Sequence, residues 1–432
     1  MHQRSIDTEL ASPPARIGLS ADTLADADSA VQALIDAEQL AGAVVIVARR
    51  GRVGHFRAYG RLSVDTGAPM PEDAIFRIAS MTKPVGSVAA MMLYDEGRLD
   101  LDAPASEYLP ELADMQVVAS AEAAVAAEAD ADPGADQLAL VAAERPITVR
   151  DLLRHTSGLP GAARYLAGNT AVDRRYRQLG MHLLEEHTLE EAMAIVGRIP
   201  LLYQPGSRWH YSVSADVVGR LVEVVSGQAF DAFLADRIFR PLGMTDTGFF
   251  VPAAKRDRFA ALHGPSDGPS ERGGLRTMAL PRPPAAPDPG HDFERRPRFL
   301  SNGGGLVSTA SDYMRFCLML TGGGTLGEKR ILTPEAVALM TRNHLPEELI
   351  PLDKQPEERY DGLGFGLGVS VRVHRTDWIP AAQVGEYGWI GGASTEFWIA
   401  PQAELAVVAL AQHIPFSRLT EVVKPIVYAA LQ

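Results

Sequence analysis

Cysteine is nearly absent from this sequence of 432 residues, which contains only Cys317. A chain with one cysteine cannot close an internal disulfide, and it suits a reducing compartment. Cys317 lies in an apolar pattern of helical spacing, Tyr-Met-Arg-Phe-Cys-Leu-Met-Leu, so we expect a buried core residue. The eleven histidines show no ligand spacing beside the cysteine or a second metal residue, and the sequence therefore predicts no metal site.

Long hydrophobic runs are also missing. The first residues contain no apolar signal-peptide core, and the longest early apolar run, residues 43–48, is far too short to span a bilayer. The net charge of −13 argues against nucleic acid or an anionic membrane as a partner. Contents of 46% apolar and 22% charged residues are ordinary for a soluble globular protein. Because neither a signal-peptide core nor a membrane span is found and cysteine is so scarce, we expect a cytoplasmic protein.

Lysine is scarce, since five of the 41 basic residues are lysine and the rest are arginine. Lys83 stands three residues after Ser80 and just before an apolar run, residues 85–93, that predicts a buried helix. Pro84 fits a helix only in its first turn, so this helix should start near Ser80. Serine and lysine at this spacing share one face, and a lysine among apolar side chains can accept the serine proton. The free N–H groups at the helix start favour the negative charge of an oxyanion.

The pattern has an alternative explanation, which is a solvated lysine after a helix cap. With five lysines, and serine at roughly one residue in fifteen, about a third of such proteins would contain Ser-x-x-Lys by accident. The preference for arginine elsewhere favours the chemical interpretation, because arginine cannot act as a base.

Strand patterns cluster at both ends of the chain, and helical patterns lie between them. The expected strands are 43–48 and 53–59, which form a hairpin, and later 364–373, 383–389, 395–399 and 405–412. The helical patterns, besides the one after Ser80, are at 21–40, 147–160 (closed by Gly158 and Pro160), 189–196, 214–225, 310–320 and 417–431. The simplest assembly is an α+β fold in which one antiparallel sheet, built from the N- and C-terminal strands, is flanked by helices.

The same order predicts the domain organisation. We expect a loosely held arm, a discontinuous sheet domain and a large, mostly helical inserted domain, over 1–20, 21–105 plus 300–432, and 106–299. The functional site should lie between the last two parts, where pockets commonly form. Residues 119–143 are interpreted as a surface excursion. The Pro/Gly-rich loop 264–297 has no periodicity, and such a long loop is uncommon unless it covers a site or is mobile.

Two further stretches carry groups that could assist a serine nucleophile. Tyr211 precedes a helix and could act as a phenolate base or proton relay beside an ammonium, although a structural tyrosine is the commoner case. The stretch Tyr-Gly-Trp-Ile-Gly-Gly ends at Gly392, whose N–H could be an oxyanion donor beside that of Ser80. A glycine bulge is the alternative there.

Together these stretches resemble the serine β-lactamase and penicillin-recognising family over almost the whole chain from about Ala21. Ser80-Met-Thr-Lys83 matches the nucleophile motif of that family. The segment Leu-Leu-Arg-His-Thr-Ser-Gly-Leu at 152–159 matches a long family signature. Tyr211-Ser-Val falls where class C enzymes have Tyr-x-Asn, and the stretch from Trp389 falls where they have Lys-Thr-Gly.

The resemblance implies a β-lactamase/transpeptidase-like fold and a defined set of catalytic groups. Ser80 would be the nucleophile, and Lys83 and Tyr211 would share the work of the general base. The N–H groups of Ser80 and Gly392 would form the oxyanion hole. No cofactor is implied.

Departures from the family pattern indicate the subfamily. Val213 replaces an asparagine that would bind the side-chain amide of a β-lactam, and Trp389 replaces a lysine that would bind the carboxylate, a contact worth about 1.5–3 kcal/mol. The combination of Tyr211 in the Tyr-x-Asn position with Trp389 in the Lys-Thr-Gly position resembles the family VIII carboxylesterases. In these enzymes the Lys-Thr-Gly position is usually occupied by Trp-Gly-Gly. Here the motif reads Trp389-Ile390-Gly391. The resemblance thus assigns these three residues and Val213 to substrate binding.

Two other motifs are weaker. Gly264-Pro-Ser266-Asp-Gly268 satisfies the Gly-x-Ser-x-Gly elbow of α/β-hydrolases, but that elbow needs a strand before it and a helix after it. The glycines of residues 362–368 lack dinucleotide-loop spacing and open no helix, so a strand with close backbone neighbours is expected.

We therefore expect a serine carboxylesterase that cleaves short or medium-chain esters, small-molecule substrates, through an acyl-enzyme on Ser80. The alternatives of the same fold are a weak β-lactamase, a D-amino-acid peptidase or amidase, and an acyltransferase. A non-catalytic member that binds a ligand in the same cleft is an alternative of another class. The natural substrate, its acyl length and alcohol, and the oligomeric state stay open.

Overall fold

A seven-stranded antiparallel sheet forms the centre of the fold. The computed structural model describes residues 10–121, 138–161, 171–266, 274–278, 293–350, 352, 361–377 and 379–432. The strand order is β11-β12-β13-β14-β15-β1-β2, with every neighbouring pair antiparallel. The strands, in that order, are Leu363–Phe365, Ser370–Arg372, Tyr387–Gly391, Thr395–Ala400, Leu405–Ala411, Gly42–Arg49 and Arg52–Gly60. The N-terminal hairpin thus pairs with the last strand, which confirms the predicted α+β fold.

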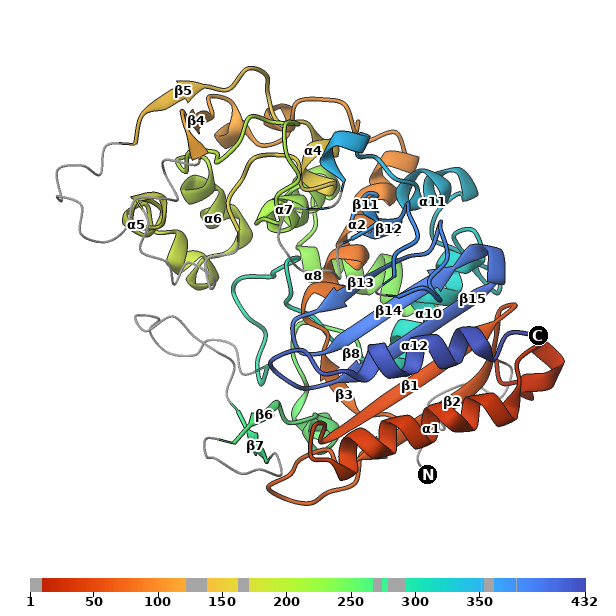
Figure 1. Cartoon of the computed structure of the whole chain (residues 1–432). Coiled ribbons are helices and arrows are strands. Elements are labelled where there is room, and N and C mark those ends of the chain that lie inside the picture. Colours follow the sequence, from red (N-terminus) through yellow and green to blue (C-terminus); the bar gives the residue numbers. More distant parts are fainter. Residues whose placement is uncertain are drawn as a thin grey trace.

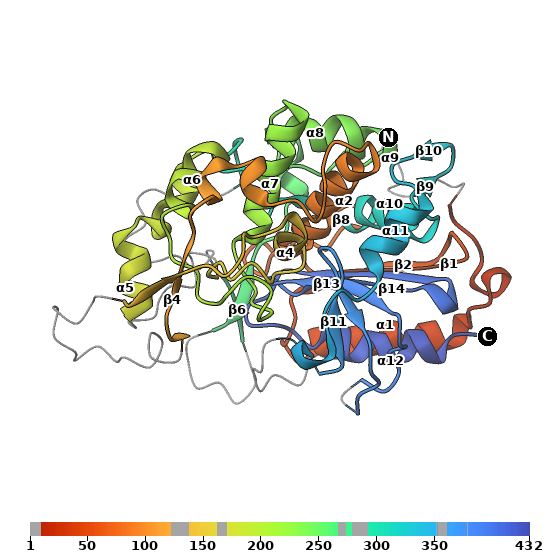
Figure 2. The same cartoon turned by 90° about the horizontal axis from the view of Figure 1, so that it is seen from above.

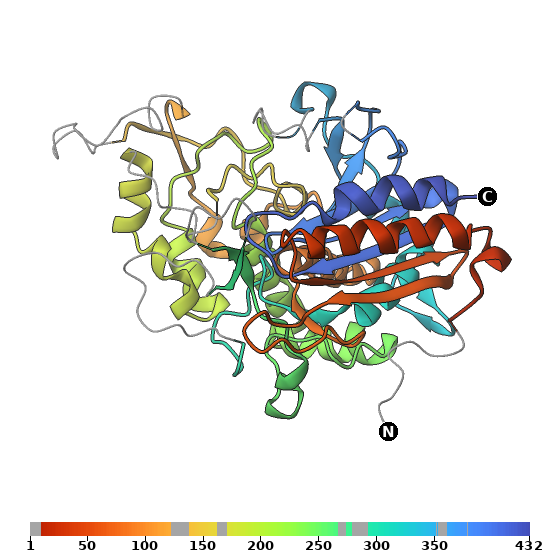
Figure 3. The same cartoon turned by 60° about the horizontal axis from the view of Figure 1, so that its bottom comes forward.

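Helices cover both faces of the sheet. On the outer face, α1 (Ala21–Asp36) and α12 (Leu419–Ala429) lie side by side (Figure 1, Figure 3). On the inner face lie α2 (Thr82–Asp95) and α10 (Ala310–Thr321), as the view from above shows (Figure 2). Because both faces are covered, every residue of β1 is buried, and its alternate side chains enter two different apolar clusters.

The remaining helices gather beside and above the inner face. They are α4 (Val149–Leu153), α5 (Ala171–Gln178), α6 (Leu189–Val196), α7 (Ser214–Ser226), α8 (Phe230–Leu234), α9 (Arg240–Leu242) and α11 (Pro334–Thr341). Figure 1 shows α4, α5, α6 and α7 together beyond one end of the sheet. The apolar face of α7 packs against α2, so the helical part and the sheet part share one continuous core.

Short two-stranded ladders complete the described chain. They pair β3 (Ile75–Arg77) with β8 (Val307–Thr309), β4 (Gln116–Val118) with β5 (Leu140–Ala142), β6 (His263–Pro265) with β7 (Leu275–Thr277), and β9 (Thr325–Leu326) with β10 (Lys329–Arg330). Strands β5 and β7, and the end of β6, lie in segments predicted without regular structure, 119–143 and 264–297. Most of both segments, including 122–137 and 279–292, lies outside the described residues.

Two predictions about local structure need correction. Residues 10–20 are not a loose arm, because Ile17 and Leu19 are buried against the sheet domain; residues 1–9 lie outside the described part. The predicted strand 364–373 is two strands, because Gly368 has a positive φ and its Cα packs on Ser87 of α2. A side chain at that glycine would overlap Ser87, so a turn forms there.

The structure also bears on two sequence predictions, the burial of Cys317 and the lack of a membrane-spanning segment. Cys317 lies on α10 and is fully buried, as predicted, and burial raises the pKa of its thiol well above the usual value. In the described part of the chain, no helix combines the length and the apolar character needed to cross a bilayer.

Candidate active site

Ser80 lies in a single 3₁₀ turn, Ala79–Met81, that runs directly into α2. The α-helix itself begins at Thr82, two residues later than the serine. Ala79 has a φ of 46°, in the left-handed region that non-glycine residues rarely adopt. Strain of this kind costs of order 1–3 kcal/mol and persists where the surroundings enforce it, often at functional sites. Here Thr82 donates its hydroxyl to the Ala79 carbonyl at 2.7 Å, which holds the turn.

Lys83 is brought against Ser80 as its spacing predicts. The Lys83 Nζ lies 3.3 Å from Ser80 Oγ and donates to the Gly303 carbonyl at 2.5 Å. The same nitrogen lies 4.4 Å from the centre of the Tyr211 ring. Lys83 is only 5% exposed, whereas Ser80 is half-buried and reachable. A shielded amine and an accessible hydroxyl are what proton abstraction from a nucleophile requires.

Tyr211 is held in place by residues 155–160, which overlap the end of the family signature at 152–159. Main-chain hydrogen bonds join the two stretches: His210 N–H donates to His155 O at 2.8 Å, and Val213 N–H donates to Pro160 O at 3.0 Å. Hydroxyls add a link, with Ser157 Oγ 2.7 Å from Ser214 Oγ. Residues 155–160 therefore hold the backbone of the loop that carries Tyr211.

Aromatic rings surround the Tyr211 side of the site. Its ring centre lies 4.9 Å from that of His155, 5.6 Å from that of Trp389 and 6.1 Å from that of Trp209. Phe365 packs edge-on against Trp389 at 5.2 Å. Burial, and next the charge of Lys83, lower the pKa of His155 well below its usual value, so this ring is neutral. The wall of the site is thus apolar and uncharged.

The end of β13 and the start of β14 are docked onto the turn that carries Ser80. Thr395 donates its hydroxyl to the Ile78 carbonyl at 3.1 Å, and a Cβ on Gly391 would overlap that same carbonyl. Glycine is needed here because the two backbones touch. Gly392 follows at once, which places it beside the turn of Ser80. Its role as oxyanion donor stays a prediction.

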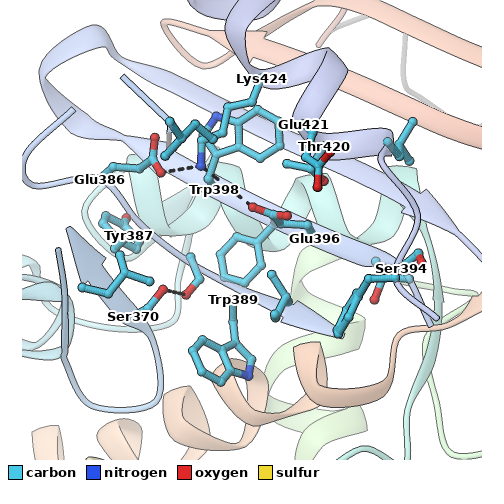
Figure 4. Close-up of a pocket in the computed structure, with 18 of the residues that line it drawn as sticks. Ser370, Glu386, Tyr387, Trp389, Ser394, Glu396, Trp398, Thr420, Glu421 and Lys424 are labelled. Carbon is cyan, nitrogen blue, oxygen red and sulfur yellow. Dashed lines mark hydrogen bonds and ion pairs between the residues drawn. The ribbon is translucent and has the colours of Figure 1, made fainter. Parts of the chain in front are cut away.

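The two other residues assigned to substrate binding are placed differently. Val213 is 2% exposed and belongs to the apolar core at the start of α7. Ile390 follows Trp389 on β13, and successive side chains of a strand point to opposite faces. Trp389 extends away from Lys424, Glu386 and Trp398 (Figure 4). The side chain of Ile390 therefore lies on the outer face, away from Ser80, which corrects its assignment.

That outer face carries a separate pocket, drawn in Figure 4, between β12–β14 and α12. Three of its charged groups are paired with one another, since Lys424 Nζ lies 2.5 Å from Glu386 Oε1 and 3.8 Å from Glu396 Oε1. Ser370 donates to the Gly388 carbonyl at 3.0 Å. The pocket lies across the sheet from Ser80 and takes no part in the site.

The other sequence motifs lie elsewhere. Ser266 is exposed at the end of β6 and its N–H donates to Gly274 O at 2.8 Å, so it sits in a hairpin and not in an elbow before a helix. Residues 362–368 form β11 and the turn after it, where no helix begins. Among the described residues, no three His, Cys, Asp or Glu side chains are grouped so that they could hold a metal ion.

Sequence reasoning missed the loop that supports Lys83. Ser301-Asn-Gly-Gly-Gly305, hereafter the glycine loop, supplies the carbonyl of Gly303 to the amine. The only local signal was the run of three glycines, which marks a close backbone approach but not its partner. His155 and Phe365 were missed in the same way, because their contacts are distant in sequence.

The family described as Beta-lactamase matches residues 27–420. The chain belongs to the beta-lactamase family. Esterase EstB of Burkholderia gladioli is 34% identical over 314 residues, which cover 70% of this chain and 71% of EstB. EstCE1, described as a hydrolase with promiscuous acyltransferase activity, has a TM-score of 0.72 and 26% identity, over 94% of this chain and 99% of its own. Simvastatin synthase LovD from Aspergillus terreus has a TM-score of 0.76 and 25% identity, over 96% and 100%.

This beta-lactamase-family chain thus has the serine hydrolase fold, with both esterase and acyltransferase relatives. The long signature at 152–159 and the Ser-x-x-Lys motif predicted this family from the sequence.

Proposed function

We propose that this protein is a serine carboxylesterase that forms an acyl-enzyme on Ser80. The observation that carries the proposal is the buried Lys83 amine, 3.3 Å from the accessible Ser80 hydroxyl. Lys83, assisted by Tyr211, takes the serine proton as Oγ attacks the ester carbonyl, and the proton is returned to the leaving alkoxide. Water then attacks the acyl-enzyme by the same route. The N–H groups of Ser80 and Gly392 hold the oxyanion.

The aromatic rings packed around Tyr211 favour short or medium-chain neutral esters as substrates. Where a class C enzyme would present a lysine, Trp389 presents an indole packed against Tyr211 and Phe365. A substrate carboxylate finds no cation at that position, while an apolar acyl chain gains contact area. The relationship to an esterase at 34% identity supports the same choice.

The test is hydrolysis of p-nitrophenyl butyrate together with labelling by a fluorophosphonate. Ser80→Ala should abolish both turnover and labelling. Ser266→Ala is the matched control, because it removes the serine of the competing motif and should leave turnover near wild type. An active Ser80→Ala enzyme, or a label found on Ser266, would overturn the proposal.

Acyl transfer to an alcohol is the second candidate function. It is favoured by two structural relatives, EstCE1, a hydrolase with promiscuous acyltransferase activity, and simvastatin synthase LovD. The chemistry differs only in the acceptor, since an alcohol replaces water at the acyl-enzyme. Adding a short alcohol during ester turnover and measuring the ratio of new ester to free acid separates the two functions.

A further inference from the structure

The glycine loop joins the helix that carries Lys83 to the helix that follows Tyr211. Its Asn302 side chain donates to the Ala215 carbonyl at 2.9 Å, on α7. Gly86 of α2 lies directly beneath it, because a Cβ there would overlap the Asn302 side chain. Leu306, just after the loop, donates its N–H to Thr82 Oγ1 at 3.1 Å. The loop is therefore clamped between α2 and α7.

A buried carboxylate lies at this joint. Asp216 Oδ1 accepts hydrogen bonds from the Gly303 N–H and from the Ser301 hydroxyl, both at 2.8 Å. The carbonyl of the same Gly303 accepts from Lys83 Nζ at 2.5 Å. A Cβ on Gly303 would lie 2.9 Å from Asp216 Oδ2, so the close approach requires glycine. Gly303 thus donates its N–H to Asp216 and accepts a hydrogen bond from Lys83 on its carbonyl oxygen.

A role in helix capping alone does not explain Asp216. An acidic residue in the first turn of a helix interacts well with the helix dipole, and Asp216 occupies the first turn of α7. This interaction with the helix dipole does not require the carboxylate to be buried, yet Asp216 is only 7% exposed. Burial of a carboxylate is costly unless hydrogen bonds compensate for it. Here the described partners of the carboxylate lie on the glycine loop.

We propose that Asp216 is a positioning residue for Lys83 and that it acts through the main chain of Gly303. The proposal rests on the proposed function, because it concerns how Lys83 is held for proton transfer with Ser80. A lysine has a long flexible side chain, so the place of its amine depends on its acceptors. Asp216 fixes Gly303, and Gly303 fixes the amine opposite Ser80 Oγ. A misplacement of about 1 Å at this point costs up to about a hundredfold in rate.

Asp312 offers a matched control. It is the third residue of α10, as Asp216 is the third residue of α7. It is 5% exposed, and it also accepts one main-chain N–H, from Asp246 at 2.7 Å, and one hydroxyl, from Thr247 at 2.9 Å. These partners belong to another loop. Asp312→Ala therefore removes the same kind of support from a place that does not hold Lys83.

The experiment compares Asp216→Ala, Asp216→Asn and Asp312→Ala, with kcat and KM for p-nitrophenyl butyrate, the rate of Ser80 labelling by a fluorophosphonate, and Tm. Asp216→Ala should lower kcat and the labelling rate about 10- to 100-fold, with KM within about threefold. Asp216→Asn keeps the shape and one acceptor oxygen, so its kcat should fall between wild type and Asp216→Ala. Asp312→Ala should lower Tm and keep kcat within about threefold.

Three results would overturn the proposal. One is wild-type kcat in folded Asp216→Ala, or in Asp216→Asn if the alanine variant does not fold. Another is an equal loss of kcat in the Asp216 and Asp312 variants at equal loss of Tm, which indicates a structural role only. The third is equal loss in Asp216→Asn and Asp216→Ala, which indicates charge and not position. Failure of the proposed function is distinguishable, because it would show in wild type and Ser80→Ala before any of these variants is compared.

Discussion

Replacement of Lys83 by arginine separates a base from a charge at the centre of the site. Lys83 is 5% exposed, and its nitrogen lies 3.3 Å from Ser80 Oγ and 2.5 Å from the Gly303 carbonyl. Arginine keeps the positive charge but cannot give up a proton at neutral pH, so it cannot take one from serine. Loss of a general base costs about 10²- to 10⁴-fold in rate. This corresponds to about 3–5 kcal/mol of transition-state stabilisation.

The assay is kcat/KM for p-nitrophenyl butyrate at one pH, with Lys83→Arg and Lys83→Ala measured beside wild type. Both variants should be slower than wild type by the same large factor. A small primary amine added to Lys83→Ala should restore part of the rate, because the vacated space lies next to Ser80 Oγ; it should not help Lys83→Arg, where the space is filled. Circular dichroism and Tm show whether each variant is folded. If Lys83→Arg keeps more than about a tenth of the wild-type rate, the lysine acts by its charge and the mechanism is wrong.

The remaining predictions concern selectivity and pH. We expect kcat/KM for p-nitrophenyl butyrate to exceed that for a chromogenic cephalosporin by at least about a hundredfold. The carboxylate and the side-chain amide of the cephalosporin find neither the lysine nor the asparagine of class C enzymes, and each poorly paired polar group costs about 1–3 kcal/mol. Comparable kcat/KM values in one buffer would contradict this, and Trp389→Lys should reduce the difference. Burial raises the pKa of Asp151, but hydrogen bonds from Arg145, Thr148 and Thr156 outweigh it and set the pKa to about 2. Since the folded pKa is below the unfolded one, this carboxylate contributes about 2–3 kcal/mol above pH ~4, and the contribution is lost as the pH falls toward ~2. Urea unfolding of Asp151→Asn should therefore show that loss at pH 7 and a smaller one near pH 3. As a control, Asp102→Asn, which removes a carboxylate that is mostly exposed in its ion pair with Arg150, should cost under about 1 kcal/mol. An Asp151→Asn deficit that does not shrink in acid would contradict the assignment.

Local patterns predicted those parts of the fold that local chemistry determines. The period of the apolar residues gave the buried helix after Ser80 and the sheet strands, with α6 and α7 close to their predicted bounds. Lys83 reached Ser80 because residues three apart on a helix share a face. The segment 152–159 predicted the family, although its mechanical task, holding the Tyr211 loop, became visible only in the structure.

Features that depend on distant contacts could not be predicted. The break between β11 and β12 follows from Ser87 on α2, and the order in residues 10–20 follows from packing of Ile17 and Leu19 on the sheet domain. Asp216 and Gly303 are 87 residues apart, so their hydrogen bond leaves no local pattern. The strained φ of Ala79 likewise has no sequence signature, because alanine itself does not favour that conformation.

A covalent acyl-enzyme at Ser80 is the species on which the proposed function depends most. Ester turnover stopped by acid within milliseconds to seconds, followed by mass spectrometry of the intact protein and its peptides, measures this species directly. We expect a mass increase equal to the acyl group on the peptide that contains Ser80. It should be present in wild type and absent in Ser80→Ala. Rapid turnover in wild type with no acyl mass at any time, or with the acyl group on another residue, would contradict it.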